Sequence, residues 1–359
     1  MITKRTLARN AKKVATLTLS IAAVAGLAAC SSGGASAAST AAAGAPVWAM
    51  VTDQAGLGDK GFNDLAKAGI DDSVTKLGGT EQILQSTDQS QYVTNLQQAV
   101  TGGATVTTGV GFLLTDAMVQ IAQANPNAKF TLIDSIAADS AGNPVPNVAS
   151  ITFKEQEASF LAGIVAGLTT KTNNIGFVGG IEIPSVDRFY SGFAAGIQEV
   201  NPSAKVTAAY VGDFADSAKA KELATGFYDQ GADIVMDVAG AAGLGTFDAA
   251  KSLGANHWVV STDTCKESLA PDNFLTSAVK DVQGSVLNEN TAAANGTFKG
   301  GSTVLGLADN GVGLCQDNIS TIPSSIMTKV TAATAAIKAG TLVPPATPDE
   351  LKTFKPGTL

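Results

Sequence analysis

The chain has 359 residues and a formal net charge of −8, and 45% of its residues are hydrophobic. The first 29 residues carry five basic residues and no acidic residue, so a chain without them has 18 basic against 31 acidic residues, a charge of −13. This balance argues against nucleic acid as a partner, because nucleic-acid binding depends on basic side chains that neutralise phosphates. The remaining 330 residues (359 minus 29) exceed one ordinary hydrophobic core and predict two domains.

Residues 1–29 have the pattern of a secretory signal. A basic head precedes an apolar run over 14–25, which is too short to span a bilayer as a stable helix. Leu27, Ala28 and Ala29 lead directly to Cys30, which resembles the lipobox of bacterial lipoproteins. We expect cleavage before Cys30 and lipid on its thiol, which would anchor the protein on the extracytoplasmic face of the cell membrane. A plain secretory signal with an incidental cysteine is the alternative.

The segment after the cysteine predicts a flexible tether over 30–46. Residues 31–46 contain only Ser, Gly, Ala, Thr and one Pro, and such a composition cannot bury much apolar surface. The later apolar stretches are short and are interrupted by Gly, Asp or Asn, so the sequence predicts no transmembrane span after the signal.

The next part of the chain alternates β-rich and helical patterns. Strands are expected at 47–51, from 83, and at 105–110, 130–133 and 147–153, with helices at 64–77, 92–101 and 116–124. Asp116 begins the last of these helices and is expected to cap it. Apolar strands joined by helices predict a mostly parallel sheet that is covered on both faces.

The same rhythm restarts after a helix at 155–168. Strands are expected at 175–178, 206–211, 234–238, 258–261 and 274–279, with helices at 186–200, 217–228 and 245–252. We therefore expect an α/β protein with two doubly wound lobes, the first from 47–152 plus about 281–305 and the second from 153–280 plus about 306–359. Ligands of such sheets bind at the carboxyl ends of the strands, so the cleft between the lobes is the expected site.

Catalytic signatures are weak in this sequence. His257 is the only histidine, it precedes an expected strand, and a structural role is favoured. The chain therefore offers almost no material for a histidine triad or a metal cluster, and we expect no enzyme activity, no metal and no other cofactor. The run from Gly240 to Gly245 has the spacing G-x-x-G-x-G, which fits either a loop whose amides face a ligand or an ordinary glycine-rich turn.

Cys265 and Cys315 form an even pair once Cys30 is used for lipid. In an oxidising compartment such a pair favours a disulfide, and two free buried thiols are the alternative.

A series of motifs runs along the chain at 51–53, 59–63, 124–127, 130–134, 160–163, 175–180, 192–196, 210–216, 231–235 and 276–280. In their residues and their order, these motifs resemble those of the basic membrane protein family, the PnrA-like solute-binding lipoproteins of ABC transporters. The resemblance covers most of residues 47–285. It implies a type I periplasmic-binding-protein fold whose lobes close on a solute and present it to a membrane permease, with purine nucleosides as the best ligand class.

The resemblance also implies which residues bind the base of such a ligand. Phe62 and Phe214 match its stacking positions, and Asp53 and Asp134 match positions at the base edge, with Asn63 beside them. Each also has a simpler interpretation, because aspartate often forms turns or caps at strand ends, Asn63 can start a helix, and a loop Phe can merely cover a lobe edge.

Asp263 and Lys280 match the pair that binds the ribose, and Gly240 would bring backbone close to the sugar. Lys280 beside Asp281 could instead be a solvated pair. The sequence departs from the family pattern at Gln54 and after Asp263, where Thr264, Cys265 and Lys266 follow. A ligand sensor for a membrane signalling partner, and a binder of another small solute such as a sugar, remain the alternative functions.

Overall fold

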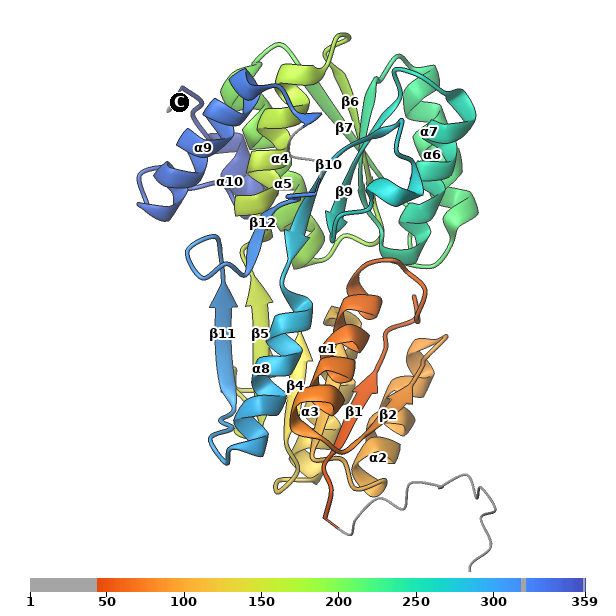
Figure 1. Ribbon diagram of the computed structural model, residues 1–359, viewed down its shortest axis with the longest axis vertical. Coiled ribbons are helices and arrows are strands. Elements are labelled where there is room, and N and C mark those ends of the chain that lie inside the picture. The colour runs from red at the N-terminus through yellow and green to blue at the C-terminus, as the bar shows by residue number, and fades with distance from the viewer. Residues whose placement is uncertain (1–43, 318–320, 358) are drawn as a thin grey trace, which may run out of the picture. The chain divides into compact units, whose positions relative to one another are not determined.

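Two sheets of six strands form the framework of the computed structural model (Figure 1), which describes residues 44–317, 321–357 and 359. These residues belong to one compact unit, Ala41–Leu359. Cys30, the expected signal over 1–29 and most of the expected tether lie outside the described residues. None of the described helices has the length and apolar character needed to cross a membrane.

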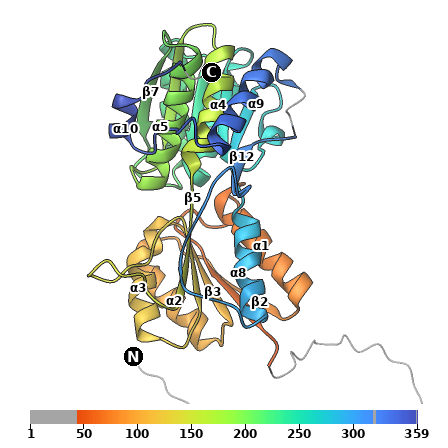
Figure 2. The same cartoon turned by 90° about the vertical axis from the view of Figure 1, so that its left-hand side faces the viewer.

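The first sheet is entirely parallel. Its strands, in spatial order, are β11 (Gly301–Leu305), β5 (Val148–Phe153), β4 (Phe130–Ile133), β3 (Val106–Val110), β1 (Val47–Val51) and β2 (Thr80–Leu84). Helices α1 (Phe62–Leu77) and α8 (Val282–Ala294) pack together on one face, and α2 (Tyr92–Thr101) and α3 (Thr115–Ala124) on the other (Figure 2). We call this sheet and its four helices the first lobe.

The second sheet is parallel except at one edge, where β12 runs antiparallel to β10. Its strands, in spatial order, are β12 (Val312–Leu314), β10 (Phe274–Lys280), β9 (Trp258–Asp263), β8 (Ile234–Val238), β6 (Asn174–Gly179) and β7 (Lys205–Tyr210). Its helices are α4 (Glu155–Thr169), α5 (Pro184–Val200), α6 (Ser217–Asp229), α7 (Leu244–Leu253), α9 (Ser324–Lys338) and α10 (Pro348–Thr353). We call this sheet and its helices the second lobe.

Burial on both faces explains why the central strands consist mostly of apolar and small uncharged residues, with Asp237 in β8 as the charged exception. Every residue of β3, β4 and β8 is buried, as expected for strands between two helical layers. The expected fold class, an α/β protein with two doubly wound lobes, is therefore confirmed.

The chain passes from one sheet to the other at three places among the described residues. The crossings lie between β5 and α4, between β10 and α8, and between β11 and β12. No elements were expected from the sequence after residue 285. The structure has the strands β11 and β12 there, one in each sheet, and the helices α9 and α10. The lobe boundaries expected from the sequence stay a prediction.

The expectation that Asp116 caps its helix is wrong. Helix α3 begins one residue earlier at Thr115, after the short helix η2 (Phe112–Leu114), and its N-terminus has no side-chain cap. Because η2 runs directly into α3, the first amides of α3 already follow helical backbone, and Asp116 lies inside the first turn.

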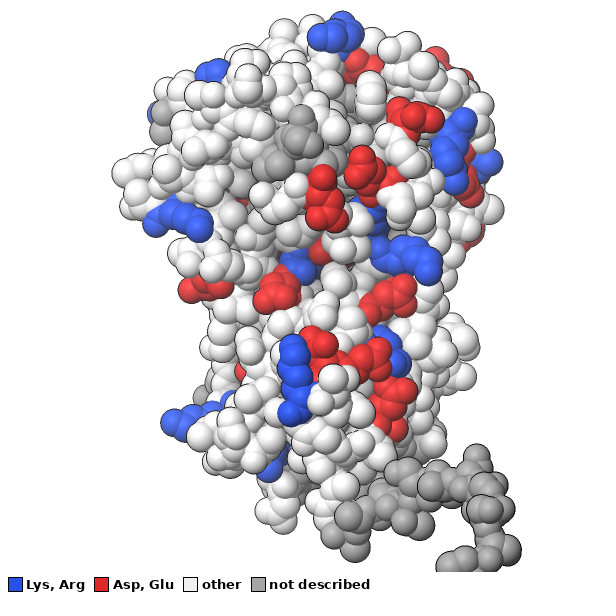
Figure 3. Space-filling view, viewed as in Figure 1, with Lys and Arg blue, Asp and Glu red and all other residues white. Residues whose placement is uncertain are grey.

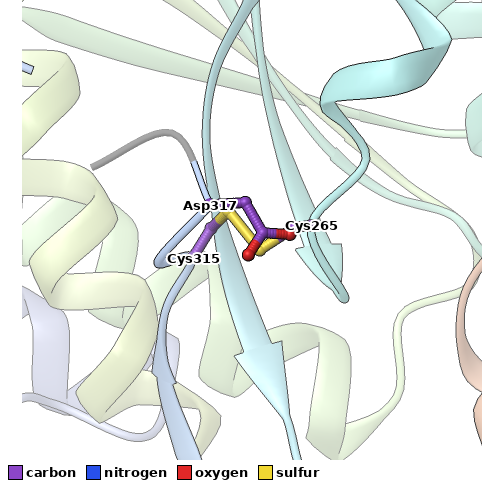
Figure 4. A group of neighbouring side chains, drawn as sticks. All are labelled: Cys265, Cys315 and Asp317. Atoms are coloured by element: carbon purple, nitrogen blue, oxygen red, sulfur yellow. A yellow bond between two sulfur atoms is a disulfide. The ribbon is translucent and has the colours of Figure 1, made fainter. Parts of the chain in front are cut away.

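A disulfide joins Cys265, in the loop after β9, to Cys315, just beyond β12, with Cα atoms 5.3 Å apart (Figure 4). The side chain of Asp317 lies beside the two sulfur atoms. The bond holds the loop that follows Asp263 against the edge of the second sheet.

Candidate ligand-binding site

A cavity lies where strands of both sheets reach their carboxyl ends. It contains about 570 Å³ of space free of protein atoms, its open mouth included. All eight residues selected from the sequence line it, namely Asp53, Phe62, Asn63, Asp134, Phe214, Gly240, Asp263 and Lys280. The structure thus brings together residues that are separated by up to 227 positions in the chain (280 minus 53), whereas their contact with a ligand stays a prediction.

Asp53 and Asn63 form a hydrogen-bonded pair at the first-lobe side of the cavity. Asn63 Nδ2 donates to Asp53 Oδ1 over 2.8 Å, and the Ala55 N–H donates to the same oxygen over 3.0 Å. Asn63 lies in the first turn of α1, so it both starts the helix and faces the cavity. Burial raises the pKa of Asp53 to about 6, although the bonds from Asn63 and Ala55 act in the opposite direction.

Two buried acceptors in this cavity have no hydrogen-bond partner among the described residues. They are Asn63 Oδ1 and Asp134 Oδ1, and both belong to residues on the first-lobe side. Buried polar atoms are nearly always paired, so unpaired acceptors in a cavity mark positions where a ligand's donors could bind.

Phe62 and Phe214 reach the cavity from different lobes. Phe62 is the first residue of α1, and Phe214 lies in the loop after β7. The loop is held by a hydrogen bond from the Ala242 N–H to the Phe214 carbonyl oxygen, and a Cβ atom at Gly180 would overlap the Phe214 ring. Gly240, with φ of 58°, lies beside the same ring, so glycine at these positions leaves the space that the ring occupies.

Lys280 is the centre of a buried charge network. Its Nζ lies 2.6 Å from Asp134 Oδ2, 3.6 Å from Glu155 Oε1 and 3.7 Å from Asp263 Oδ1. It also lies 4.6 Å from the centre of the Phe62 ring, within cation–π range. The side chain is nearly inaccessible, so the alternative of a solvated pair with Asp281 is wrong; Asp281 instead caps α8 through the Gly284 N–H.

The charges around Lys280 decide its protonation. Burial alone would lower the pKa of this ammonium, but Asp134, Asp263 and Glu155 together hold its pKa well above the ordinary value. Lys280 therefore stays charged and keeps the neighbouring carboxylates in an ionic network that joins the two lobes.

Sequence reasoning missed several residues at this site. Asp59 also lines the cavity and accepts hydrogen bonds from the backbone N–H groups of Gly61, Asn63 and Asp64, so it caps α1 from three residues before the helix. The sequence offered a signal here, since Asp59 is followed by a turn that contains Gly61, and an aspartate in such a turn often precedes a helix.

Glu155 and Asp237 are two further buried acids, near Lys280 and Lys266, that were not selected from the sequence. Glu155 pairs with Arg188 and lies near Lys280, and burial raises its pKa despite these cations. Burial likewise raises the pKa of Asp237 to about 6. Asp237 had a sequence signal, because it lies within the apolar run 234–238 that predicts a strand covered on both faces. Glu155 had none, because its burial depends on contacts between distant elements.

Two α/β lobes with a lined cavity at the carboxyl ends of their strands define a solute-binding protein of the type I periplasmic fold. A solved ABC transporter solute-binding protein from Aeropyrum pernix has the same fold, with a TM-score of 0.77, 25% identity, and coverage of 86% of this chain and 96% of that one. The chain belongs to the family described as ABC transporter substrate-binding protein PnrA-like, which matches residues 47–343. The resemblance drawn from the sequence is therefore confirmed.

Two relatives illustrate the family. A CD4+ T-cell-stimulating antigen of Listeria monocytogenes is 37% identical, with 76% of this chain and 81% of that protein covered. An ABC transporter nucleoside-binding protein of Lactococcus lactis is 36% identical, with 75% and 81% covered. Like other members of its class, the protein is a substrate-binding component that works outside the cytoplasm.

Proposed function

We propose that the protein captures a purine nucleoside in the cavity between its lobes and delivers it to an ABC permease, while lipid on Cys30 holds it at the membrane. The observation that carries the ligand class is the presence of two unpaired buried acceptors, Asn63 Oδ1 and Asp134 Oδ1, in the cavity that Asp53 also lines. A purine base carries N–H donors on its edge and would pair with such acceptors.

The aromatic residues support a flat ligand. Phe62 and Phe214 enter the cavity from opposite lobes, so a base between them would contact both when the lobes close. Stacking on an aromatic ring contributes about 1–3 kcal/mol for each base contact. Two rings would therefore supply a large share of the roughly 8 kcal/mol that micromolar binding requires.

Asp263 and Lys280 support a sugar with neighbouring hydroxyl groups. A carboxylate accepts hydrogen bonds from two hydroxyls at once, and the Lys280 ammonium, 3.7 Å from Asp263 Oδ1, could donate to a hydroxyl oxygen. The same pair would also suit a free sugar, but a sugar bound there would offer no base N–H donors to the acceptors near Asp53.

The charge of the cavity favours an unphosphorylated ligand. Among the described residues, Asp53, Asp59, Asp134 and Asp263 line it together with a single cation, Lys280, which already contacts two of these acids. A phosphate would be repelled by the remaining carboxylates, so nucleosides are favoured over nucleotides.

Mass spectrometry of the small molecules released from the purified protein on denaturation tests this proposal. We expect a purine nucleoside at close to one molecule per chain. A free sugar or a phosphorylated nucleotide in that stoichiometry would refute the proposed ligand class.

A further inference from the structure

Lys266 is a buried lysine whose role the ligand site does not explain. It lies in the second lobe, in the loop after β9, and is only 3% exposed. Its ammonium forms no hydrogen bond or ion pair with the described residues, it is not among their fully buried unpaired nitrogen and oxygen atoms, and Lys266 does not line the cavity. A buried ammonium is costly unless nearby charges compensate it, so its surroundings decide what it does.

Gly61, which immediately precedes α1 in the other lobe, lies close to Lys266. A Cβ atom added to Gly61 would lie 3.1 Å from Lys266 Nζ and 3.3 Å from Asp263 Oδ2. The backbone of Gly61, in the first lobe, therefore lies close to both the Lys266 ammonium and the Asp263 carboxylate of the second lobe. A side chain at this position would crowd both groups, so glycine favours the close approach.

Carboxylates from both lobes surround this contact. Burial raises the pKa of Asp59, in the first lobe, and the charge of Lys266 opposes that rise. The same charge opposes the effect of burial on Asp237 in the second lobe. Lys266 thus lies among Asp59, Asp237 and Asp263, and the attraction to Asp59 is the part that separation of the lobes would remove.

The loop that carries Lys266 is held in place from two sides. The disulfide fixes its neighbour Cys265 to Cys315, and Ser277 Oγ donates to the Thr264 carbonyl oxygen over 2.6 Å. The loop then continues into the short helix η4 (Glu267–Leu269). The ammonium is therefore presented to the first lobe by a fixed segment, which reduces the conformational entropy lost on closure.

We propose that Lys266 is a positioning residue that holds the two lobes closed around the ligand site, with the Cys265–Cys315 bond keeping its loop in register. This inference rests on the proposed function for its effect on the ligand. The contact itself joins protein groups only, so it also favours the closed form of the ligand-free protein.

The test compares Lys266→Met with Lys60→Met, which removes the same charge from an exposed residue next to Gly61. In stopped-flow experiments with adenosine, guanosine or inosine, Lys266→Met should release the ligand at least about tenfold faster, with an association rate within about threefold of the original, because loss of a closing contact acts mainly on dissociation. Lys60→Met should change neither rate. A Lys266→Met release rate within about twofold of the original overturns the proposal.

A second variant, Cys265→Ser with Cys315→Ser, keeps Lys266 and frees its loop. We expect this variant to release the ligand faster than the original protein, and an unchanged release rate would refute the role assigned to the disulfide.

Small-angle scattering of the ligand-free proteins is a measurement that needs no nucleoside. Lys266→Met should have a larger radius of gyration than the original protein, and Lys60→Met should not. If the original protein binds no nucleoside, the proposed function fails, and equal radii in all three proteins then refute the closing role separately.

Discussion

Lys280 has three carboxylates within 3.7 Å of its ammonium and almost no contact with solvent. Removing one partner from such a network leaves uncompensated buried charge, which typically costs about 3–5 kcal/mol. We predict that Lys280→Met lowers the free energy of unfolding in urea at pH 7 by roughly that amount. The loss should become smaller at acidic pH as Glu155, whose pKa burial raises, takes up a proton.

The exposed Lys76, which pairs with Asp72 within α1, provides the control for Lys280. Lys76→Met should cost no more than about 0.5 kcal/mol, as is usual for exposed pairs. Equal effects of the two substitutions would mean that the network around Lys280 has no special energetic role.

The burial of Asp53 lowers the stability of the folded protein at neutral pH. Burial raises its pKa from 3.8 to about 6. The folded protein therefore binds a proton more tightly than the unfolded chain, so the favourable contribution of Asp53 is complete below about pH 4 and is lost as the pH rises through 6. At about 1.4 kcal/mol for each pKa unit, the loss amounts to about 3 kcal/mol.

We predict that Asp53→Asn is more stable than the original protein at pH 7 by up to about 3 kcal/mol, and that this difference disappears near pH 4. The amide oxygen of the new asparagine can still accept from Asn63 and Ala55, so the local geometry should persist. Urea unfolding at pH 4, 5.5 and 7 measures this. A difference between the two proteins that does not change with pH would show that Asp53 keeps an ordinary pKa.

At the scale of elements, the closest packing in the second lobe is between α4 and α5. A Cβ atom on Gly196 would overlap the carbonyl oxygen of Phe160, and one on Gly192 would overlap that of Gln156. The two helix backbones therefore touch, and α4 is buried along most of its length. Because α4 begins with Glu155, this packing also fixes one carboxylate near Lys280.

We predict that Gly196→Ala destabilises the protein by about 1–3 kcal/mol or more, because the added methyl group must push the helices apart. Gly226 in α6 is the matched control, since its Cβ would meet only one atom, 3.9 Å away. Gly226→Ala should stabilise by about 0.4–1 kcal/mol. Thermal unfolding of both variants measures the contrast, which two shifts in the same direction would contradict.

The sequence predicted most of the strands from their apolar runs. The eight cavity residues came from the resemblance to the basic membrane protein family, and the position of several of them at or just after strand ends supported that choice. Asp263 and Lys280 are examples, since each is the last residue of its strand. The elements after residue 285 were harder, because β12 has only three residues and the edge strand β11 (GSTVL) is largely exposed and lacks an apolar run.

Long-range burial is the other property that local patterns could not show. Lys266 was visible only as a departure from the family's sequence, and Glu155 only as the start of a helix. Lys266 is buried where α1 packs near the loop after β9, and Glu155 is buried where α4 packs against α5 and β10. No spacing of residues in the sequence predicts such contacts between distant elements.

At the scale of the whole molecule, surface charge gives no single-sign patch on the face in Figure 3, where acidic and basic side chains lie close together. Charged side chains of both signs are therefore interspersed on this face. Attachment to the membrane would depend on lipid at Cys30 more than on attraction to anionic headgroups, which repel an acidic protein.

We predict that the original protein partitions into the detergent phase in Triton X-114 extraction and that Cys30→Ser moves to the aqueous phase. Acylation accounts for this difference, since every buried methylene adds about 0.8 kcal/mol of membrane affinity. Identical partitioning of the two proteins would exclude lipid on Cys30.

The central claim is that the cavity between the lobes binds a purine nucleoside. Isothermal titration calorimetry with adenosine, guanosine and inosine, beside arabinose as a free sugar, tests it most directly, with Asp263→Ala as the site variant. We predict that at least one of the nucleosides binds with a Kd of about 10 μM or tighter, that Asp263→Ala abolishes this binding, and that arabinose gives no heat of binding. Binding of arabinose without any nucleoside binding, or nucleoside binding that Asp263→Ala leaves unchanged, would contradict the claim.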